Sequence, residues 1–187
     1  MLRVLFLGLA LLAMPAYGGP DRYQLDAARS LVQFTYVFNG TRRTGRMPVK
    51  SADLLIDLDN LPASRVIVTL NARRARAGFI FATETMKSRD VLNTAQFPEI
   101  TFRSTRFSGG LNGATVTGDL TIRDVTRPIT LKAGLFRQRG TVAGDRDNLD
   151  VLLTGTVSRA AFGAGGFSRQ VGDRIGLRII ARITKAP

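Results

Sequence analysis

Apolar and polar residues alternate with a period of two along much of this chain, and this alternation constrains the fold more than any other feature. Val66, Val68 and Leu70 fall on one face of an extended segment, while Ile67 and Thr69 fall on the other. The same spacing recurs in residues 32–38, 54–59, 116–123 and 175–183. Such alternation is typical of β-strands that have one buried face. The sequence therefore predicts a fold built from strands.

Turn-forming residues separate these segments. They include Asn39-Gly40, Asn60-Leu61-Pro62, Gly109-Gly110, Asn112-Gly113 and the stretch from Gly144 to Asn148. Regularly spaced strands with turns between them predict an all-β sandwich or barrel. The chain has 187 residues and shows no composition shift or internal repeat, so we expect one domain.

One short helix is expected, over residues 84–92. Thr83 is the candidate N-cap, and Glu84 lies in the first turn. Pro98 prevents the helix from extending further.

The absence of histidine and cysteine excludes several kinds of site. Without cysteine there is no disulfide, thiolate nucleophile or sulfur-ligated metal. Without histidine the chain lacks the commonest general base and the middle member of a Ser-His-Asp triad. The pairs Asp57/Asp59 and Asp145/Asp147 end a strand and lie in a turn, so we interpret them as solvated turn residues. We therefore predict a protein that is not an enzyme and has no metal or organic cofactor; an enzyme that uses a carboxylate or Arg159 in a cavity is the less favoured alternative.

The N-terminus has the features of a secretory signal peptide over residues 1–18. One positive charge at Arg3 precedes an apolar run from Val4 to Met14, and Ala16 and Gly18 occupy the −3 and −1 positions of a cleavage site. An uncleaved membrane anchor is the alternative, but about 20 apolar residues are needed to span a bilayer. We expect a mature protein, residues 19–187, that is exported to the periplasm.

The formal net charge of +13 comes mainly from arginine. The densest clusters are Arg42, Arg43 and Arg46, and then Arg73, Arg74 and Arg76. They indicate either an anionic partner, such as an acidic membrane surface, or a solvated surface rich in arginine. Neither cluster is interleaved with aromatic residues as in single-strand binders, so no nucleic-acid partner is expected.

Four segments carry a resemblance to a known family. They are Tyr23-Gln-Leu-Asp26 followed by Ser30, Val32 and Phe34; MKSRDVLNTAQFPEITFRST at 86–105; GDLTIRDVTRPITL at 118–131; and VSRAAFGAG with VGDRIGLRI at 157–165 and 171–179. Together they resemble the YceI-like polyisoprenoid-binding proteins of bacterial envelopes, over about residues 23–183. The resemblance implies a single antiparallel β-barrel of about eight strands, lipocalin-like, with a small helix.

The resemblance also implies a function: a soluble carrier or sequestering protein that holds an isoprenoid quinone or a similar long apolar chain inside the barrel. A ten-residue strand rises about 33 Å, and at a tilt of about 40° the barrel is about 25 Å tall, long enough for an extended tail. Family members often have histidines near the positions of Arg29, Phe38 and Thr85. Because this chain differs there, a fatty-acid-like anion rivals a neutral quinone as ligand. The second functional hypothesis is a basic envelope adaptor that binds anionic lipid or an acidic protein through its outer surface.

Twelve residues are candidates for contact with such a ligand. The wall candidates are Phe34, Tyr36, Phe38, Val68, Leu70, Phe102, Leu120 and Ile122; Met86, Leu92 and Phe97 are candidates at the mouth, and Arg159 is the polar candidate. Each has a structural alternative, because inward residues of small barrels often fill a solid core. For Arg159 the alternative is closure of the barrel floor against carbonyl groups, since a lone buried guanidinium is costly.

Overall fold

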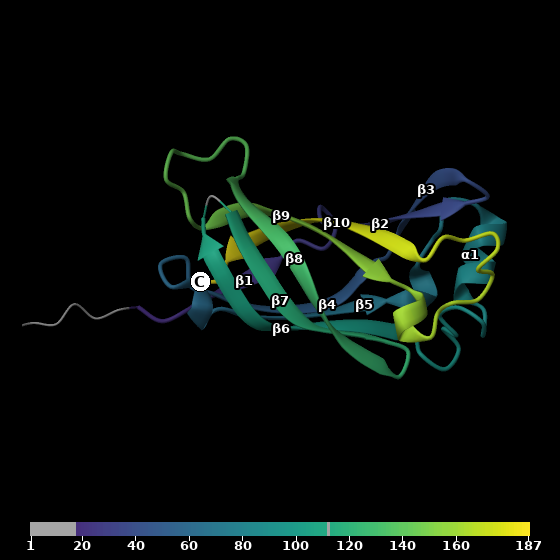
Figure 1. Ribbon diagram of the computed structural model, residues 1–187. Helices are drawn as coiled ribbons and strands as arrows, with labels where there is room; N and C mark the ends of the chain where they lie inside the picture. The colour runs from purple at the N-terminus through teal and green to yellow at the C-terminus, as the bar shows by residue number, and fades with distance from the viewer. Residues whose placement is uncertain (1–17, 112) are drawn as a thin grey trace, which may run out of the picture.

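The computed structural model describes residues 18–111 and 113–187, and these form an all-β structure with one α-helix (Figure 1). The signal-peptide prediction concerns residues 1–18 and so lies almost wholly outside the described residues. The strands are β1 (Asp21–Leu25), β2 (Leu31–Phe38), β3 (Thr41–Arg46), β4 (Val49–Ile56), β5 (Arg65–Asn71), β6 (Glu99–Gly110), β7 (Gly113–Ile122), β8 (Val125–Arg137), β9 (Asn148–Ser158) and β10 (Arg174–Lys185). In residues 18–111 and 113–187, no helix has the length and apolarity needed to cross a membrane.

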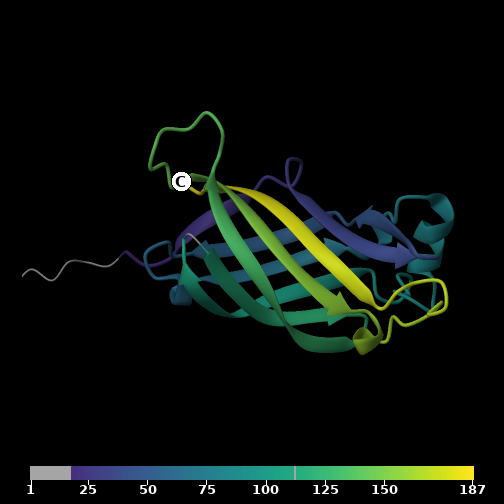
Figure 2. The ribbon, with the colours of Figure 1, turned by 45° about the horizontal axis from the view of Figure 1, so that its top comes forward.

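The strands close into an antiparallel barrel. The sheet order is β1-β4-β5-β6-β7-β8-β9-β10-β2-β3, and a further pairing of β1 with β10 joins its ends. β2 and β1 lie one after the other along β10, and they pair on their other side with β3 and β4. The ten segments therefore occupy eight positions around the ring. Figure 2 shows the barrel from a second angle. This confirms the predicted eight-stranded barrel.

The predicted alternation places alternate side chains inside the ring. Val66, Val68 and Leu70 of β5 point inward, and Phe102 of β6 lies beside Val68 in the register of the two strands. A bulge between Ser104 and Arg106 shifts the phase of β6, so that Phe107 again faces the interior. The segment from Glu99 to Phe107 thus forms part of the barrel wall.

The helix differs from its predicted position. α1 spans Ile80–Lys87, with Phe79 as N-cap, instead of residues 84–92. Thr83 does not cap it: within α1 its hydroxyl donates to the carbonyl of Phe79 at 2.9 Å and accepts from the amide of Ala77 at 3.0 Å. After Ser88 the chain forms turns, and Asn93 has a positive φ of 46°.

Apolar clusters pack at both ends of the barrel. Leu92, Val157 and Phe162 belong to the cluster next to α1. Tyr23 and Ile183 belong to another cluster, at the far end of β10. Phe162, in the 3₁₀ helix η3 (Ala160–Phe162), is only 2% exposed, and Ile183 of the other cluster is 1% exposed, so each cluster contains a large, fully buried side chain.

We predict that Phe162→Ala lowers the free energy of unfolding by about 3–5 kcal/mol, because it leaves a cavity in this packed end. Phe136→Ala is the matched control, since Phe136 is 55% exposed and its loss should cost less than about 0.5 kcal/mol. Urea unfolding followed by circular dichroism measures both. Equal losses in the two variants would contradict this view of the core.

Candidate functional site

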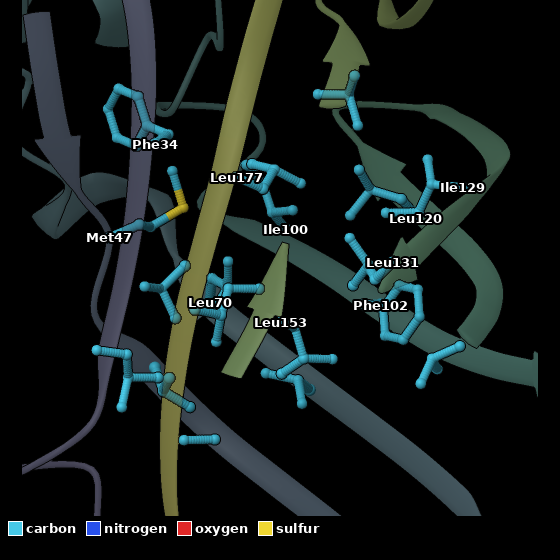
Figure 3. Close-up of a pocket in the computed structure, with 18 of the residues that line it drawn as sticks. Phe34, Met47, Leu70, Ile100, Phe102, Leu120, Ile129, Leu131, Leu153 and Leu177 are labelled. Atoms are coloured by element: carbon cyan, nitrogen blue, oxygen red, sulfur yellow. The ribbon is translucent and has the colours of Figure 1, made fainter. Parts of the chain in front are cut away.

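A cavity of about 340 Å³ runs inside the barrel. Every strand except β3 contributes to its lining, and Ala82, Thr85 and Met86 of α1 line it at one end. Figure 3 shows Leu70, Ile100, Leu120 and Leu153 as they line it from four different strands. The volume lies within the range of small-molecule pockets, about 300–1,000 Å³. The barrel is therefore hollow between its packed ends.

The lining is almost entirely apolar. Among its 48 residues, only Ser30, Tyr36, Thr85 and Arg159 have polar side-chain groups. The hydroxyl of Ser30 donates to the carbonyl of Asp26 at 2.6 Å and accepts from the amide of Arg182. The hydroxyl of Tyr36 donates to the carbonyl of Ala77 at 2.6 Å. These two groups are thus satisfied by the main chain and make no demand on a ligand.

Arg159 is held by the main chain. It is 6% exposed, and its Nη1 donates to the carbonyls of Ala164 and Gly166 at 2.6 and 2.7 Å. Its Nε donates to Gly172, and its Nη2 donates to Val171 at 2.9 Å and to Gly165 at 3.5 Å. Burial lowers the pKa of Arg159, and the carboxylate of Asp173 partly opposes this shift. All five N–H groups of Arg159 are directed at carbonyls. The geometry therefore favours a structural role, in which Arg159 closes the end of the barrel next to α1, over contact with a ligand.

Thr85 differs from the other three polar residues. It lines the cavity from α1, whereas the polar groups of Ser30, Tyr36 and Arg159 are already bonded to the main chain. It is therefore the polar group best placed to meet an oxygen atom inside the cavity. Sequence reasoning noted this position only as one where the family often has histidine.

The structure brings eleven of the twelve predicted residues to the cavity. They are Phe34, Tyr36, Phe38, Val68, Leu70, Met86, Leu92, Phe102, Leu120, Ile122 and Arg159. Phe97 is not in the lining; its ring lies under the guanidinium of Arg123, 5.8 Å from ring centroid to Cζ. Placement on the cavity wall is observed, whereas contact with a ligand stays a prediction.

Glycines on the inner face keep the bore open. A Cβ at Gly118 would lie 2.5 Å from Cζ of Phe102, so this ring lies flat over the glycine. Gly45 gives the same room to Phe34 on the neighbouring strand. Gly155 pairs with Leu177, and a Cβ at this position would clash in the same way, 2.5 Å from Cδ2 of Leu131. Large side chains thus lie along the wall because three inward positions have no side chain.

Sequence reasoning missed the contribution of β8 and β9. Ile129, Leu131 and Leu135 of β8 and Val151 and Leu153 of β9 all line the cavity. The period-two signal is present in both strands. Pro128 interrupts it in β8, and the outward Leu152 hides it in β9.

The paired aspartates form turns as predicted, but Asp57 is only 9% exposed, so the prediction that it is solvated is wrong. Oδ1 of Asp57 accepts from the amides of Asp59 and Asn60, and Oδ1 of Asp145 accepts from the amide of Asp147. Across residues 18–111 and 113–187, no three acidic side chains are grouped as they would be around a metal ion.

Comparison with known proteins identifies the family. The model of the YceI-like domain matches residues 23–182, which is most of the chain. The chain belongs to the YceI-like family. This YceI-like chain is 38% identical over 82 residues to "Protein YceI" of Escherichia coli, a match that covers 44% of the chain and 43% of that relative. The matched region therefore spans less than half the length of that relative.

Solved structures share the fold of this YceI-like chain. The BcnA structure of Burkholderia cenocepacia superposes with a TM-score of 0.74 at 18% identity, over 85% of this chain and 99% of that one. A polyisoprenoid-binding domain from Saccharophagus degradans, implicated in plant cell wall breakdown, gives a TM-score of 0.63 at 12% identity, over 89% and 99% of the two chains. At these identities the likeness establishes the fold.

We predict that Gly155→Ala narrows the bore without unfolding the protein. The nearest atom to the new Cβ is the end of the flexible Leu131 side chain, which must swing into the cavity. Binding of the neutral apolar dye N-phenyl-1-naphthylamine, measured by fluorescence titration, should weaken about fivefold, or roughly 1 kcal/mol. Gly176→Ala is the control, because its Cβ would make an ordinary contact of 3.7 Å with Thr35. Unchanged dye affinity in Gly155→Ala would contradict this role of the glycine.

We predict a loss of stability at alkaline pH that depends on Tyr36. Burial raises the pKa of Tyr36 above its ordinary value of 10.0, and Arg43 partly opposes the shift. The protonated phenol is therefore the form that the fold favours, so its contribution is complete below about pH 10 and disappears as the pH rises through the higher folded pKa. Tyr36→Phe should cost about 1 kcal/mol at neutral pH through the lost hydrogen bond. Urea unfolding at neutral and alkaline pH should show this difference narrowing above about pH 10; a constant difference would count against it.

Proposed function

We propose that this YceI-like protein binds an isoprenoid or a similar long apolar chain inside its barrel and does so as a non-catalytic carrier or sequestering protein. The observation that carries the proposal is the cavity itself: a closed barrel with a bore of about 340 Å³ and four polar side chains among 48 lining residues. The polyisoprenoid-binding domain of Saccharophagus degradans, which has the same fold, supports this ligand class. The signal-peptide pattern supports a periplasmic location.

The energetics favour hydrocarbon in this cavity. Water needs two to four polar partners at a buried site, and the satisfied groups of Ser30, Tyr36 and Arg159 offer few. A prenyl or acyl chain gains about 0.8 kcal/mol for each methylene moved from water into such a site. A chain that is nearly insoluble in water therefore has its most favourable position inside the barrel.

The polar end of the ligand belongs at the α1 end of the barrel. Thr85 of α1 brings a hydroxyl to the lining there, and the apolar ring of Phe38 lines the same region. A neutral carbonyl or hydroxyl suits this arrangement better than a carboxylate, because the guanidinium of Arg159 is already saturated by main-chain carbonyls. We therefore favour a neutral isoprenoid over a fatty-acid-like anion.

The test is to purify the protein from its source cells, extract it with organic solvent and identify the lipid by mass spectrometry. Leu153→Trp fills the bore with an indole, and its lipid content should fall at least about tenfold, a loss of about 1.4 kcal/mol. Thr154→Trp is the matched control, because Thr154 is the next residue of β9 and is exposed. It should retain the full lipid content.

Recovery of about one apolar chain per protein, lost only in Leu153→Trp, supports the proposal. Absence of lipid from the unmodified protein, or equal loss in both variants, would overturn it. Recovery of a fatty acid in place of a neutral lipid would reject the neutral head group alone.

A further inference from the structure

The fold brings together two arginine clusters that are far apart in the sequence. Arg46 and Arg76 form a backbone bridge in which each amide donates to the other's carbonyl, at 2.8 and 2.9 Å. The cluster on β3 (Arg42, Arg43 and Arg46) therefore lies beside the cluster on and after the 3₁₀ helix η2 (Arg73, Arg74 and Arg76). All six are exposed. We call this set the arginine rim.

The positive charge of this rim is not neutralised within the described part of the chain. None of the six arginines forms an ion pair there, and residues 41–47 and 72–83 contain no acidic residue. Glu84 follows on α1, and its carboxylate lies 3.6 Å from Lys87. Arg73 donates to the carbonyls of Thr94 and Ala95 and keeps its charge. The rim is thus a concentrated source of positive potential at one end of the barrel.

The arginine rim adjoins the most exposed apolar side chains at this end. Ile80 is 84% exposed and Phe81 is 65% exposed, both in the first turn of α1. Phe79 connects them to the rim, because the guanidinium of Arg43 lies over its ring at 5.9 Å from the centroid. The ring of Phe79 also packs edge-on against Phe38, with centroids 5.6 Å apart. Apolar residues flanked by cations therefore stand at the end of the cavity that Phe38 and α1 line.

We propose that this end of the barrel docks on an anionic lipid bilayer, with Ile80 and Phe81 entering the interface and the arginine rim contacting the head groups. Apolar side chains flanked by basic residues are the features that hold amphipathic segments at membrane surfaces. A bilayer also accepts two protruding side chains without a matching pocket, which an acidic protein partner would have to provide. This proposal rests on the proposed function, because docking brings the α1 end of the cavity to a bilayer, which is a source of apolar ligand.

The experiment is co-sedimentation of the purified protein with phosphatidylcholine vesicles, with and without phosphatidylglycerol. Binding should require phosphatidylglycerol and should weaken strongly as added salt shortens the Debye length from about 30 Å at 0.01 M to about 3 Å at 1 M. Binding should also be independent of any protein component, because the vesicles contain none.

Two pairs of variants separate this surface from the rest of the molecule. Ile80→Ser/Phe81→Ser should lower the affinity for anionic vesicles at least about tenfold, whereas Phe136→Ser/Val142→Ser should not. These exposed residues belong to the end of β8 and to the loop between β8 and β9, and this loop lies at the opposite end of the barrel from α1 (Figures 1 and 2). Arg42→Gln/Arg46→Gln/Arg74→Gln should lower it at least about tenfold. Arg103→Gln/Arg106→Gln/Arg178→Gln removes the same charge from exposed positions of the barrel wall and should change it much less.

The outcomes for docking and for the cavity are distinct. Loss of vesicle binding confined to the Ile80→Ser/Phe81→Ser variant and the variant of the arginine rim, with the extracted lipid retained in each, supports docking. Absence of vesicle binding by the folded, lipid-containing protein overturns docking alone, as expected if the surface receives an acidic protein. Equal losses in the rim variants and the wall variants also overturn it, since net charge would then explain the effect. Vesicle binding by a protein that carries no lipid would instead remove the proposed function.

Discussion

Closure of the sheet by the pairing of β1 with β10 is the constraint on which the rest of the structure depends. Tyr23, Gln24 and Leu25 pair with Lys185, Thr184 and Ile183, so the first and last described strands complete the ring. In an open sheet the inward residues of β5, β6 and β7 would face water or a second layer. In the closed ring they face one another around a bore, and the alternation of side chains becomes an apolar lining.

Whether such a ring is solid or hollow depends on a few inward positions. The phenyl ring of Phe102 and the side chain of Leu131 are large enough to block the bore, yet they lie along the wall over Gly118 and Gly155. At the α1 end, Phe162 and Arg159 complete the packing, and Arg159 donates to main-chain carbonyls there. Tyr23 and Ile183 belong to the cluster at the far end. Because main-chain carbonyls already accept the hydrogen bonds of Arg159, the lining has few polar groups left to bind water. The site is thus a property of the whole barrel more than of any single residue.

Much of the fold could be predicted because its main signal is local: Val66, Val68 and Leu70 alternate whatever the rest of the chain does. The predicted position of the helix is wrong because Thr83 has the features of an N-cap in the sequence. In the fold its hydroxyl bonds instead to Phe79 and Ala77. Phe97 was assigned to the mouth from its place after the helix, and its contact with Arg123 depends on tertiary packing. The nearness of Arg46 to Arg76 likewise has no local signal, because it arises from a bridge between distant segments. The hydrogen bonds of Arg159 depend on carbonyls from a loop up to 13 residues away. The sequence therefore does not distinguish a ligand contact from closure of the barrel end.

The central claim is that alternate side chains converge on an empty, apolar bore that hydrocarbon occupies. A high-resolution crystal structure of protein purified from its source cells tests this most directly. Our account predicts continuous, elongated density along the barrel axis, bounded by Phe102, Leu120 and Leu153, with its polar end near Thr85. A bore filled by those side chains, or one that holds only ordered water, would contradict it.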